Sequence, residues 1–128
     1  MIISDLLSSG SKILKSNKIE TYQIDSELLL SNLLRTPREK IIVNSEENIS
    51  ETTANHFNKL ITRRAMGEPL AYILENKEFW SKNFFVNRNT LIPRPETELL
   101  CDTLIKILKN KKPHILDIGT GTGCILLS

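Results

Sequence analysis

The feature of this sequence with the clearest chemical potential is the loop at residues 119–123, which reads Gly-Thr-Gly-Thr-Gly. Glycines at every second position let the backbone adopt conformations that other residues avoid and approach a ligand closely. The mostly apolar segment His114–Ile118 precedes the loop, and the apolar run Cys124–Leu127 follows it. This order predicts a strand, a glycine turn and the start of a helix. A helix start offers a ligand free N–H donors and the positive end of a dipole.

Several readings compete for this loop. A dinucleotide fingerprint requires G-x-G-x-x-G, whereas here the third glycine comes one place early and Cys124 stands at the expected position. A Walker loop is excluded because no Gly-Lys-Ser/Thr follows. S-adenosylmethionine fits better, since Asp117 at the strand end can attract its ammonium group while backbone N–H groups suit its carboxylate. A plain glycine-rich turn between strand and helix stays open as the structural alternative.

Helices are predicted for the first two thirds of the chain, because apolar residues recur there at intervals of three and four. The first is expected around Leu6–Leu14, with Ser4 or Asp5 as its cap. The second follows Asp25 and stops before Pro37, since a residue that precedes proline is pushed out of the α region. A short third helix starts at that proline.

The fourth helix has the most complete set of end signals. Ser50 is its expected N-cap and Gly67 its C-terminal stop. Arg63 and Arg64 fall in its last turn, where the helix dipole favours cations, and they either contact a partner or form a solvated helix end. Four such helices make a small bundle of roughly 70 residues. Its expected buried stripe consists of Ala54, Phe57, Leu60 and Ile61.

Aromatic residues and prolines dominate the stretch between the bundle and the glycine loop. A β-hairpin is predicted around a turn at Ser81–Asn83. Prolines 93 and 95 keep the following segment extended, and a helix is predicted over Glu96–Lys109. His114–Ile118 is then expected to be a strand of the kind found inside parallel sheets. The aromatic residues of the hairpin are Phe79, Trp80, Phe84 and Phe85.

Composition narrows the functional classes. Lys and Arg number 17 against 15 Asp and Glu, which does not favour a dedicated nucleic-acid binder. No apolar run is long enough for a membrane span, and the N-terminus lacks the features of a signal peptide, so the cytosol is the expected compartment. Cys101 and Cys124 give neither a disulfide framework nor metal-ligand spacing. His56 and His114 are expected at the surface, and no metal site is predicted.

The chain is expected to be a fragment of a longer protein. A single parallel-type strand has no partner for its backbone groups, and a parallel sheet covered on both faces takes on the order of a hundred more residues. The alternative is a complete small protein whose C-terminal residues pack on the helical bundle.

Three stretches together resemble one family, the bacterial release factor glutamine methyltransferases, also called HemK-type or N5-glutamine methyltransferases. The order and spacing of the stretches match the family, and the helical leader with Asp25–Leu30 is also similar. The string Ile-Pro-Arg-Pro-Glu-Thr-Glu is highly specific, and the resemblance spans nearly the whole chain. The three stretches are Arg63–Tyr72 continuing to Glu78–Trp80, Leu91–Leu100 and Asp117–Ile125.

Two residues depart from the family pattern. Glu75 stands where relatives usually have glycine. If the backbone needs positive φ there, we expect Asn76 to take the left-handed conformation instead, because that conformation is costly for glutamate. Thr122 replaces the more usual serine, which keeps the hydroxyl.

The resemblance implies a fold and an activity. The fold is an N-terminal α-helical bundle (1–74), a β-hairpin linker (75–93) and the beginning of an α/β Rossmann-like class I methyltransferase domain (94–128). The activity is methyl transfer from S-adenosyl-L-methionine to the glutamine amide nitrogen in the Gly-Gly-Gln loop of peptide chain release factors, which the bundle helps to hold. By carry-over, Arg94, Pro95 and Glu96 line the approach to the methionine end, and the remaining cofactor-binding residues are Asp117, Gly119, Thr120, Gly121, Thr122 and Gly123.

The family's catalytic Asn-Pro-Pro-Tyr motif does not occur in these 128 residues. In the family, that motif aims the amide nitrogen at the sulfonium methyl. No catalytic residue is therefore assigned, and these residues alone are expected to be inactive and to bind the cofactor weakly or not at all.

The resemblance also implies a cytoplasmic monomer that contacts release factors, without membrane or direct nucleic-acid binding. Three alternatives stay open. They are a ribosomal-protein glutamine methyltransferase, an amino-methyltransferase that acts on nucleic acid, and a non-catalytic module that binds a release factor.

Overall fold

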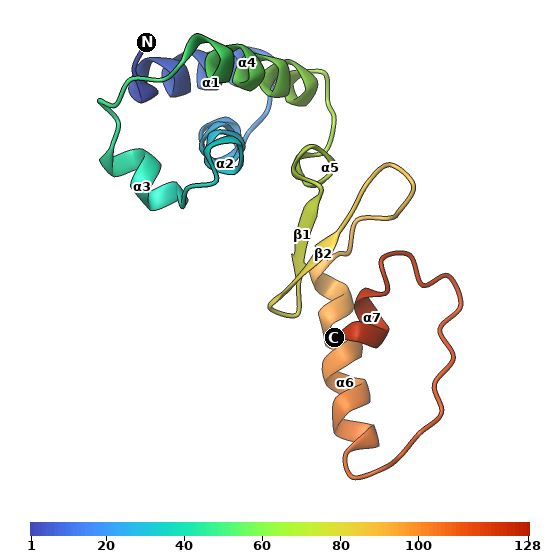
Figure 1. Ribbon diagram of the computed structural model, residues 1–128. Helices are drawn as coiled ribbons and strands as arrows, with labels where there is room; N and C mark the ends of the chain where they lie inside the picture. The colour runs from blue at the N-terminus through green and yellow to red at the C-terminus, as the bar shows by residue number, and fades with distance from the viewer. The chain divides into compact units, whose positions relative to one another are not determined.

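A computed structural model describes all 128 residues, which divide into two compact units, Met1–Leu74 and Glu75–Ser128. The first unit is entirely helical apart from its connecting loops and one isolated bridge between Ile2 and Asn48 (Figure 1). Its helices are α1 (Ile3–Ser16), α2 (Tyr22–Leu34), α3 (Arg38–Val43), α4 (Glu51–Ala65) and α5 (Leu70–Leu74).

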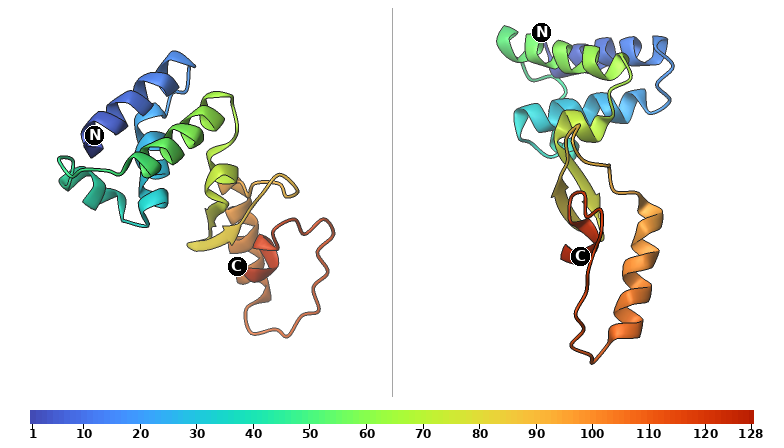
Figure 2. Two further views of the ribbon diagram at one scale, coloured as in Figure 1. Left: turned by 45° about the horizontal axis from the view of Figure 1, so that its top comes forward. Right: turned by 90° about the vertical axis from the view of Figure 1, so that its right-hand side faces the viewer.

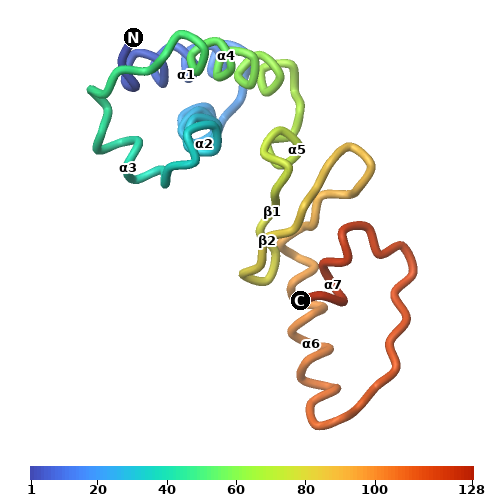
Figure 3. The backbone as a smooth tube through the Cα atoms, in the orientation of Figure 1, coloured from blue at the N-terminus to red at the C-terminus, as the bar shows by residue number.

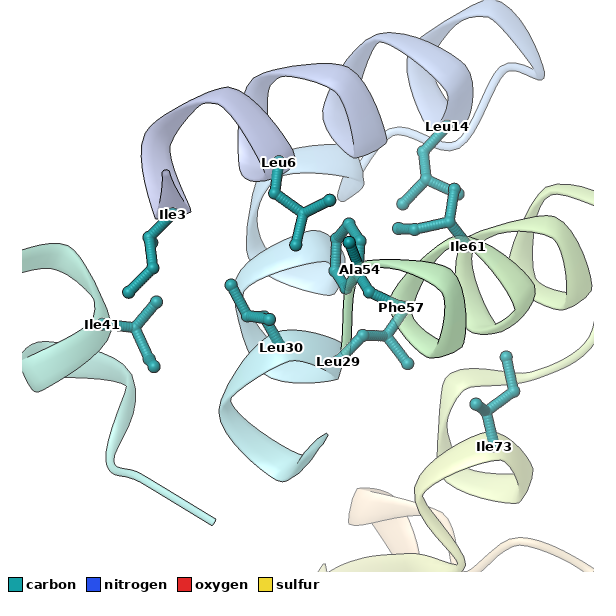
Figure 4. Close-up of a cluster of buried hydrophobic side chains, with 10 residues drawn as sticks. All are labelled: Ile3, Leu6, Leu14, Leu29, Leu30, Ile41, Ala54, Phe57, Ile61 and Ile73. Carbon is teal, nitrogen blue, oxygen red and sulfur yellow. The ribbon is translucent and has the colours of Figure 1, made fainter. Parts of the chain in front are cut away.

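All five helices contribute side chains to one core (Figure 4). Phe57 of α4 is fully buried at its centre, and Ile3 of α1 points toward Ile41 of α3. Gly10 allows α1 to pack closely against α4 and α2, because a Cβ at this position would lie 2.8 Å from the Phe57 ring and 2.9 Å from the Ser26 hydroxyl. The core therefore depends on a small residue as well as on large ones.

The expected cap of α1 is wrong. Ser4 and Asp5 lie inside the helix, which begins at Ile3 without a side-chain cap. The loop after α3 supplies the missing acceptors: the N–H of Ile3 donates to the carbonyl of Glu47 at 3.0 Å, and that of Ser4 to Ser45 at 2.9 Å. A backbone segment that is distant in sequence thus replaces the local cap, which no short-range pattern could have predicted.

The other helix ends agree more closely with expectation. The Ser50 cap of α4 is confirmed, since its hydroxyl accepts from the N–H of Thr53 at 3.2 Å. Gly67 follows the helix with φ 94°, as a C-terminal stop requires. Pro37 directly precedes α3 instead of occupying its first position, and α2 begins at Tyr22, so Asp25 lies within α2 rather than before it.

The second unit contains one antiparallel hairpin, formed by β1 (Asn76–Phe79) and β2 (Lys82–Phe85), as Figure 2 shows. The turn consists of Trp80 and Ser81, both with positive φ (51° and 55°). The expected turn at Ser81–Asn83 is therefore shifted, because Lys82 and Asn83 belong to β2 and pair with β1. Two consecutive positive φ values match the sheet's right-handed twist, a geometric demand that outweighs local turn propensity.

Glu75, at the start of this unit, corrects another expectation. It takes the left-handed conformation itself, with φ 54°, while Asn76 opens β1. The carbonyl of Glu75 accepts from the N–H of Val86 at 3.4 Å, which extends the pairing of the hairpin by one bond. The backbone pairing therefore imposes the conformation at the position before the strand, whichever residue stands there.

A short helical stretch and two α-helices complete the second unit. The helix predicted from Glu96 begins as a 3₁₀ turn, η1 (Pro95–Thr97), and continues as α6 (Glu98–Leu108), followed much later by α7 (Cys124–Leu127). Phe79 and Phe84 of the hairpin meet edge to face, with ring centroids 6.2 Å apart, and pack with Cys101 of α6. The partly buried residues around this small core are Trp80, Cys124 and Ile125.

The strand predicted at His114–Ile118 is wrong for this structure. Residues 109–123 form a loop between α6 and α7 (Figure 3). The only sheet is the hairpin. Leu116 and Ile118 are 84% and 88% exposed. A parallel strand needs a neighbour for its N–H and C=O groups, and none of these residues provides one. The start of a Rossmann-like sheet is therefore not formed.

Candidate functional site

The glycine-rich loop has the backbone that its sequence predicts. Gly119, Gly121 and Gly123 have φ values of 74°, 55° and 76°, a backbone region that residues other than glycine rarely adopt. A Cβ at Gly119 or Gly121 would meet no atom within 4 Å, so open space lies beside the backbone there. Glycine is thus required for conformation rather than for lack of room, and a ligand can approach the main chain directly.

Two hydrogen bonds organise the end of this loop. The N–H of Gly123 donates to the carbonyl of Thr120 at 2.8 Å, which closes a tight turn. The N–H of Leu127 then donates to the carbonyl of Gly123 at 3.0 Å and begins α7. The expected helix therefore starts where the sequence places it, although it has only four residues.

Two buried oxygen atoms beside the loop lack hydrogen-bond partners: Oδ2 of Asp117 and Oγ1 of Thr122. A shielded polar atom without a protein partner is costly, so these two atoms are available to a water molecule or to a ligand group. A carboxylate oxygen accepts from a cationic donor, and a threonine hydroxyl both donates and accepts. These residues therefore fit the ammonium-bearing end of S-adenosylmethionine in chemical type.

Arg94 and Glu96 do not join this loop through any hydrogen bond or ion pair. Both side chains are exposed on the extended segment and the 3₁₀ turn that precede α6. The structure thus assembles the loop residues 117–123 into one local feature and leaves Arg94 and Glu96 as free polar side chains.

Glu98 is a residue of this region that sequence reasoning missed. Its Oε1 accepts from the backbone N–H of Trp80 at 2.8 Å, which links α6 to the hairpin turn. A signal existed in the sequence, since two glutamates stand two residues apart in Pro-Glu-Thr-Glu and would point in different directions. The sequence does not say which of the two is bound.

Buried ion pairs in the helical unit were also missed. Nε of Arg64 lies 2.7 Å from Oδ2 of Asp25, with side chains only 18% and 5% exposed. Arg64 is therefore held within the unit rather than solvated. A clue was present, because Asp25 precedes the buried Leu29 by one helical turn and so shares its inward face.

Neighbouring charges form similar contacts. Arg63 binds both carboxylate oxygens of Glu68, at 2.8 and 2.7 Å, while Nη1 of Arg64 donates to the Glu68 carbonyl at 3.1 Å. Nε of Arg38 lies 2.5 Å from the buried Glu27 carboxylate. These contacts join α2 to α3, and α4 to the segment between α4 and α5.

Other kinds of site can be stated briefly. No group of three or more His, Cys, Asp or Glu side chains is placed to hold a metal ion. None of the helices combines the length and the apolar character that crossing a membrane requires. His56 and His114 are both exposed, as predicted.

Comparison with known proteins identifies a matching family and several relatives of this chain. Residues 5–74 match the family described as the PrmC N-terminal domain. Three curated proteins named release factor glutamine methyltransferase are similar over most of the chain. That from Buchnera aphidicola subsp. Acyrthosiphon pisum is 42% identical over 116 residues (91% of this chain, 42% of the relative). Those from Leptospira interrogans and Clostridium botulinum are each 40% identical, over 98% of this chain and 45% and 44% of their own lengths. The chain thus spans less than half the length of these relatives.

Proposed function

This chain belongs to the family of the PrmC N-terminal domain, and we propose that it functions in a release factor glutamine methyltransferase. The resemblance to that family, first drawn from three short stretches, is confirmed by the relatives' names and by about 40% identity over nearly the whole chain. This identity is the observation that carries the proposal. The whole enzyme is proposed to methylate the glutamine amide in the Gly-Gly-Gln loop of release factors, in the cytoplasm and as a monomer.

The two units have separate roles in this proposal. The helical bundle (1–74) docks the release factor, residues 75–93 link it onward, and residues 94–128 contribute to the cofactor site. The bundle suits a docking role because its core is closed and its buried charges are paired, so it can present a fixed surface. A rigid surface binds a folded protein at lower entropic cost than a flexible one.

Residues 117–123 are proposed to hold S-adenosyl-L-methionine, which supplies the activated methyl group. Asp117 would accept from the cofactor's ammonium group, since its Oδ2 is buried and without a partner. Gly119 and Gly121 would expose backbone N–H groups, and Thr120 and Thr122 would add hydroxyls. Gly123 would close the turn that holds them in place. Arg94 and Glu96 would approach the methionine end, for which their free side chains leave them available.

A second candidate is a non-catalytic module that binds a release factor. It is favoured by the helical unit, which closes a core of its own within Met1–Leu74. In that case binding would be retained without any methyl transfer.

One experiment separates these candidates from each other. The full gene product and residues 1–128 are each incubated with labelled S-adenosylmethionine and a release factor, or with a release factor whose loop glutamine is replaced by alanine. We expect the full product to label only the unaltered release factor, and residues 1–128 to bind it without labelling. Labelling by residues 1–128 would contradict their expected inactivity. Preferential labelling of a ribosomal protein or of DNA would instead favour a ribosomal-protein glutamine methyltransferase or an amino-methyltransferase that acts on nucleic acid.

A further inference from the structure

We propose that Glu98 is a positioning residue: its carboxylate anchors the hairpin turn to the start of α6 and so fixes the segment that carries Arg94 and Glu96. This inference rests on the proposed function, because that segment is assigned to the cofactor approach. It concerns a residue to which neither the motif resemblance nor the relatives' names give a role.

The turn that Glu98 anchors is strained. Trp80 and Ser81 have φ values of 51° and 55°, and a bulky residue such as tryptophan is a genuine outlier in this region. Such a conformation persists only when surrounding contacts fix it. The hairpin ladder sets the conformation of the turn, but it is only four residue pairs long and contributes few bonds to hold the turn in place.

The contact from Glu98 meets this need directly. Its Oε1 accepts from the Trp80 N–H at 2.8 Å, and a charged acceptor makes a stronger bond than a neutral one. One helical turn further along α6, Cys101 packs against Phe79 and Phe84. The hairpin is thus bound to the first turns of α6 by one polar and one apolar contact.

The two glutamates of Pro-Glu-Thr-Glu have different surroundings. Glu96 is exposed and without a side-chain partner, whereas Glu98 is half-buried and bound. Only Glu96 is therefore free to face a ligand. Because Glu98 follows it by two residues and Pro93 upstream is buried, the short stretch between them is held at both ends.

The hairpin also reaches the far side of the glycine loop. Nζ of Lys82, the residue after the turn, donates to the carbonyl of Leu127 in α7 at 2.8 Å. Trp80 and Lys82 thus connect the turn to the helix before the loop and to the helix after it. Fixing the turn through Glu98 restricts both of the segments that flank the proposed cofactor site.

The test compares Glu98→Ala with Glu98→Gln in the full gene product, with exposed Glu78→Ala as a matched control. The amide oxygen of glutamine still accepts a hydrogen bond, so Glu98→Gln should stay within about twofold of the unaltered protein in S-adenosylmethionine affinity. Glu98→Ala should weaken that affinity about tenfold and accelerate hydrogen exchange at the Trp80 amide. Glu78→Ala should change neither.

Each other outcome has a distinct meaning. Equal losses of affinity in Glu98→Ala and Glu98→Gln, with Trp80 exchange unchanged, would make Glu98 a direct cofactor ligand and overturn the positioning role. Faster Trp80 exchange with unchanged affinity, measured below the melting temperature of the variant, would mean that the contact only stabilises the fold. That result would also overturn the positioning role. If the unaltered protein binds no S-adenosylmethionine, the proposed function fails and the positioning role with it, while Trp80 exchange still reports whether the hydrogen bond exists.

Discussion

In Met1–Leu74, apolar side chains from five helices meet in one core, whereas in Glu75–Ser128 three buried residues make up the core of the hairpin and α6. Their backbones differ in the same way. The first unit pairs even the leading N–H groups of α1, while residues 113–117 of the second lie in neither helix nor ladder. Leu116 and Ile118, which a covered sheet would bury, are exposed.

The difference shows that forming a closed core depends on how far apart in sequence the backbone hydrogen-bond partners lie, as well as on apolar content. A helix satisfies its backbone within its own segment, so five short helices complete a unit in 74 residues. A parallel strand depends on a neighbour that arrives only after a crossover connection. The apolar residues near 115–118 therefore remain exposed to solvent, although their apolar sequence favours burial.

The largest effect is expected from removing the centre of the helical core. Phe57→Ala should lower the free energy of unfolding by about 4 kcal/mol, because it leaves a cavity at a fully buried site. Urea titration measures this, followed by far-UV circular dichroism for the helical unit and by Trp80 fluorescence for the second unit. Phe85→Ala, at a phenylalanine that is 63% exposed, is the matched control and should cost less than about 1 kcal/mol. Equal losses would contradict the contrast between the units.

The next effect concerns buried and exposed ion pairs. Arg64→Ala should cost about 3 kcal/mol, because it leaves the buried Asp25 carboxylate without its partner. The exposed pair of Lys106 and Asp102 in α6 provides the comparison, and Lys106→Ala should cost less than about 0.5 kcal/mol. Replacing both Asp25 and Arg64 by leucine should recover most of the loss in the same urea titration. A double variant no more stable than Arg64→Ala would argue against an unpaired charge as the cause.

A smaller effect is expected where α1 approaches α4. Gly10→Ala should destabilise the chain by about 1–2 kcal/mol, because the added methyl group collides with the Phe57 ring and the Ser26 hydroxyl. Ser9→Ala, at an exposed position of the same helix, should be neutral or slightly stabilising. Thermal melting of both variants tests this. A stabilised Gly10→Ala would mean that helix propensity outweighs the close packing.

The smallest effect falls in the second unit. Glu75→Gly should stabilise the hairpin by about 0.5–1 kcal/mol, because it relieves the left-handed conformation of a residue with a side chain. Hydrogen exchange at the amides of β1 and β2 measures it. Glu78→Gly, within β1, should shift exchange in the opposite direction, since glycine weakens an extended strand. Slower exchange in both variants would contradict a conformational cause.

The sequence predicted well whatever depends on neighbouring residues. Ser50 and Gly67 set the ends of α4, and the glycines of the loop at 119–123 have the predicted conformation. The apolar stripe of α4 is buried as expected at Ala54, Phe57 and Ile61, with Leu60 only partly buried.

What the sequence missed depends on residues that are far apart. The partners Asp25 and Arg64 are separated by 39 positions, and the start of α1 is completed by the loop at 45–47. The hairpin turn shifted to Trp80 because strand pairing, rather than turn propensity, sets its conformation. The assignment of residues 117–123, Arg94 and Glu96 to a cofactor stays a prediction, since its evidence is the loop's backbone and two unpartnered oxygens.

Trp80 is the only tryptophan in the chain, and it lies half-buried beside the aromatic cluster of Glu75–Ser128. Indole fluorescence therefore reports on the second unit alone, whereas ellipticity arises mainly from the five helices of the first. A single sample thus carries two independent optical labels. Emission that shifts before ellipticity falls, as denaturant rises, would show the two units melting as separate cooperative bodies.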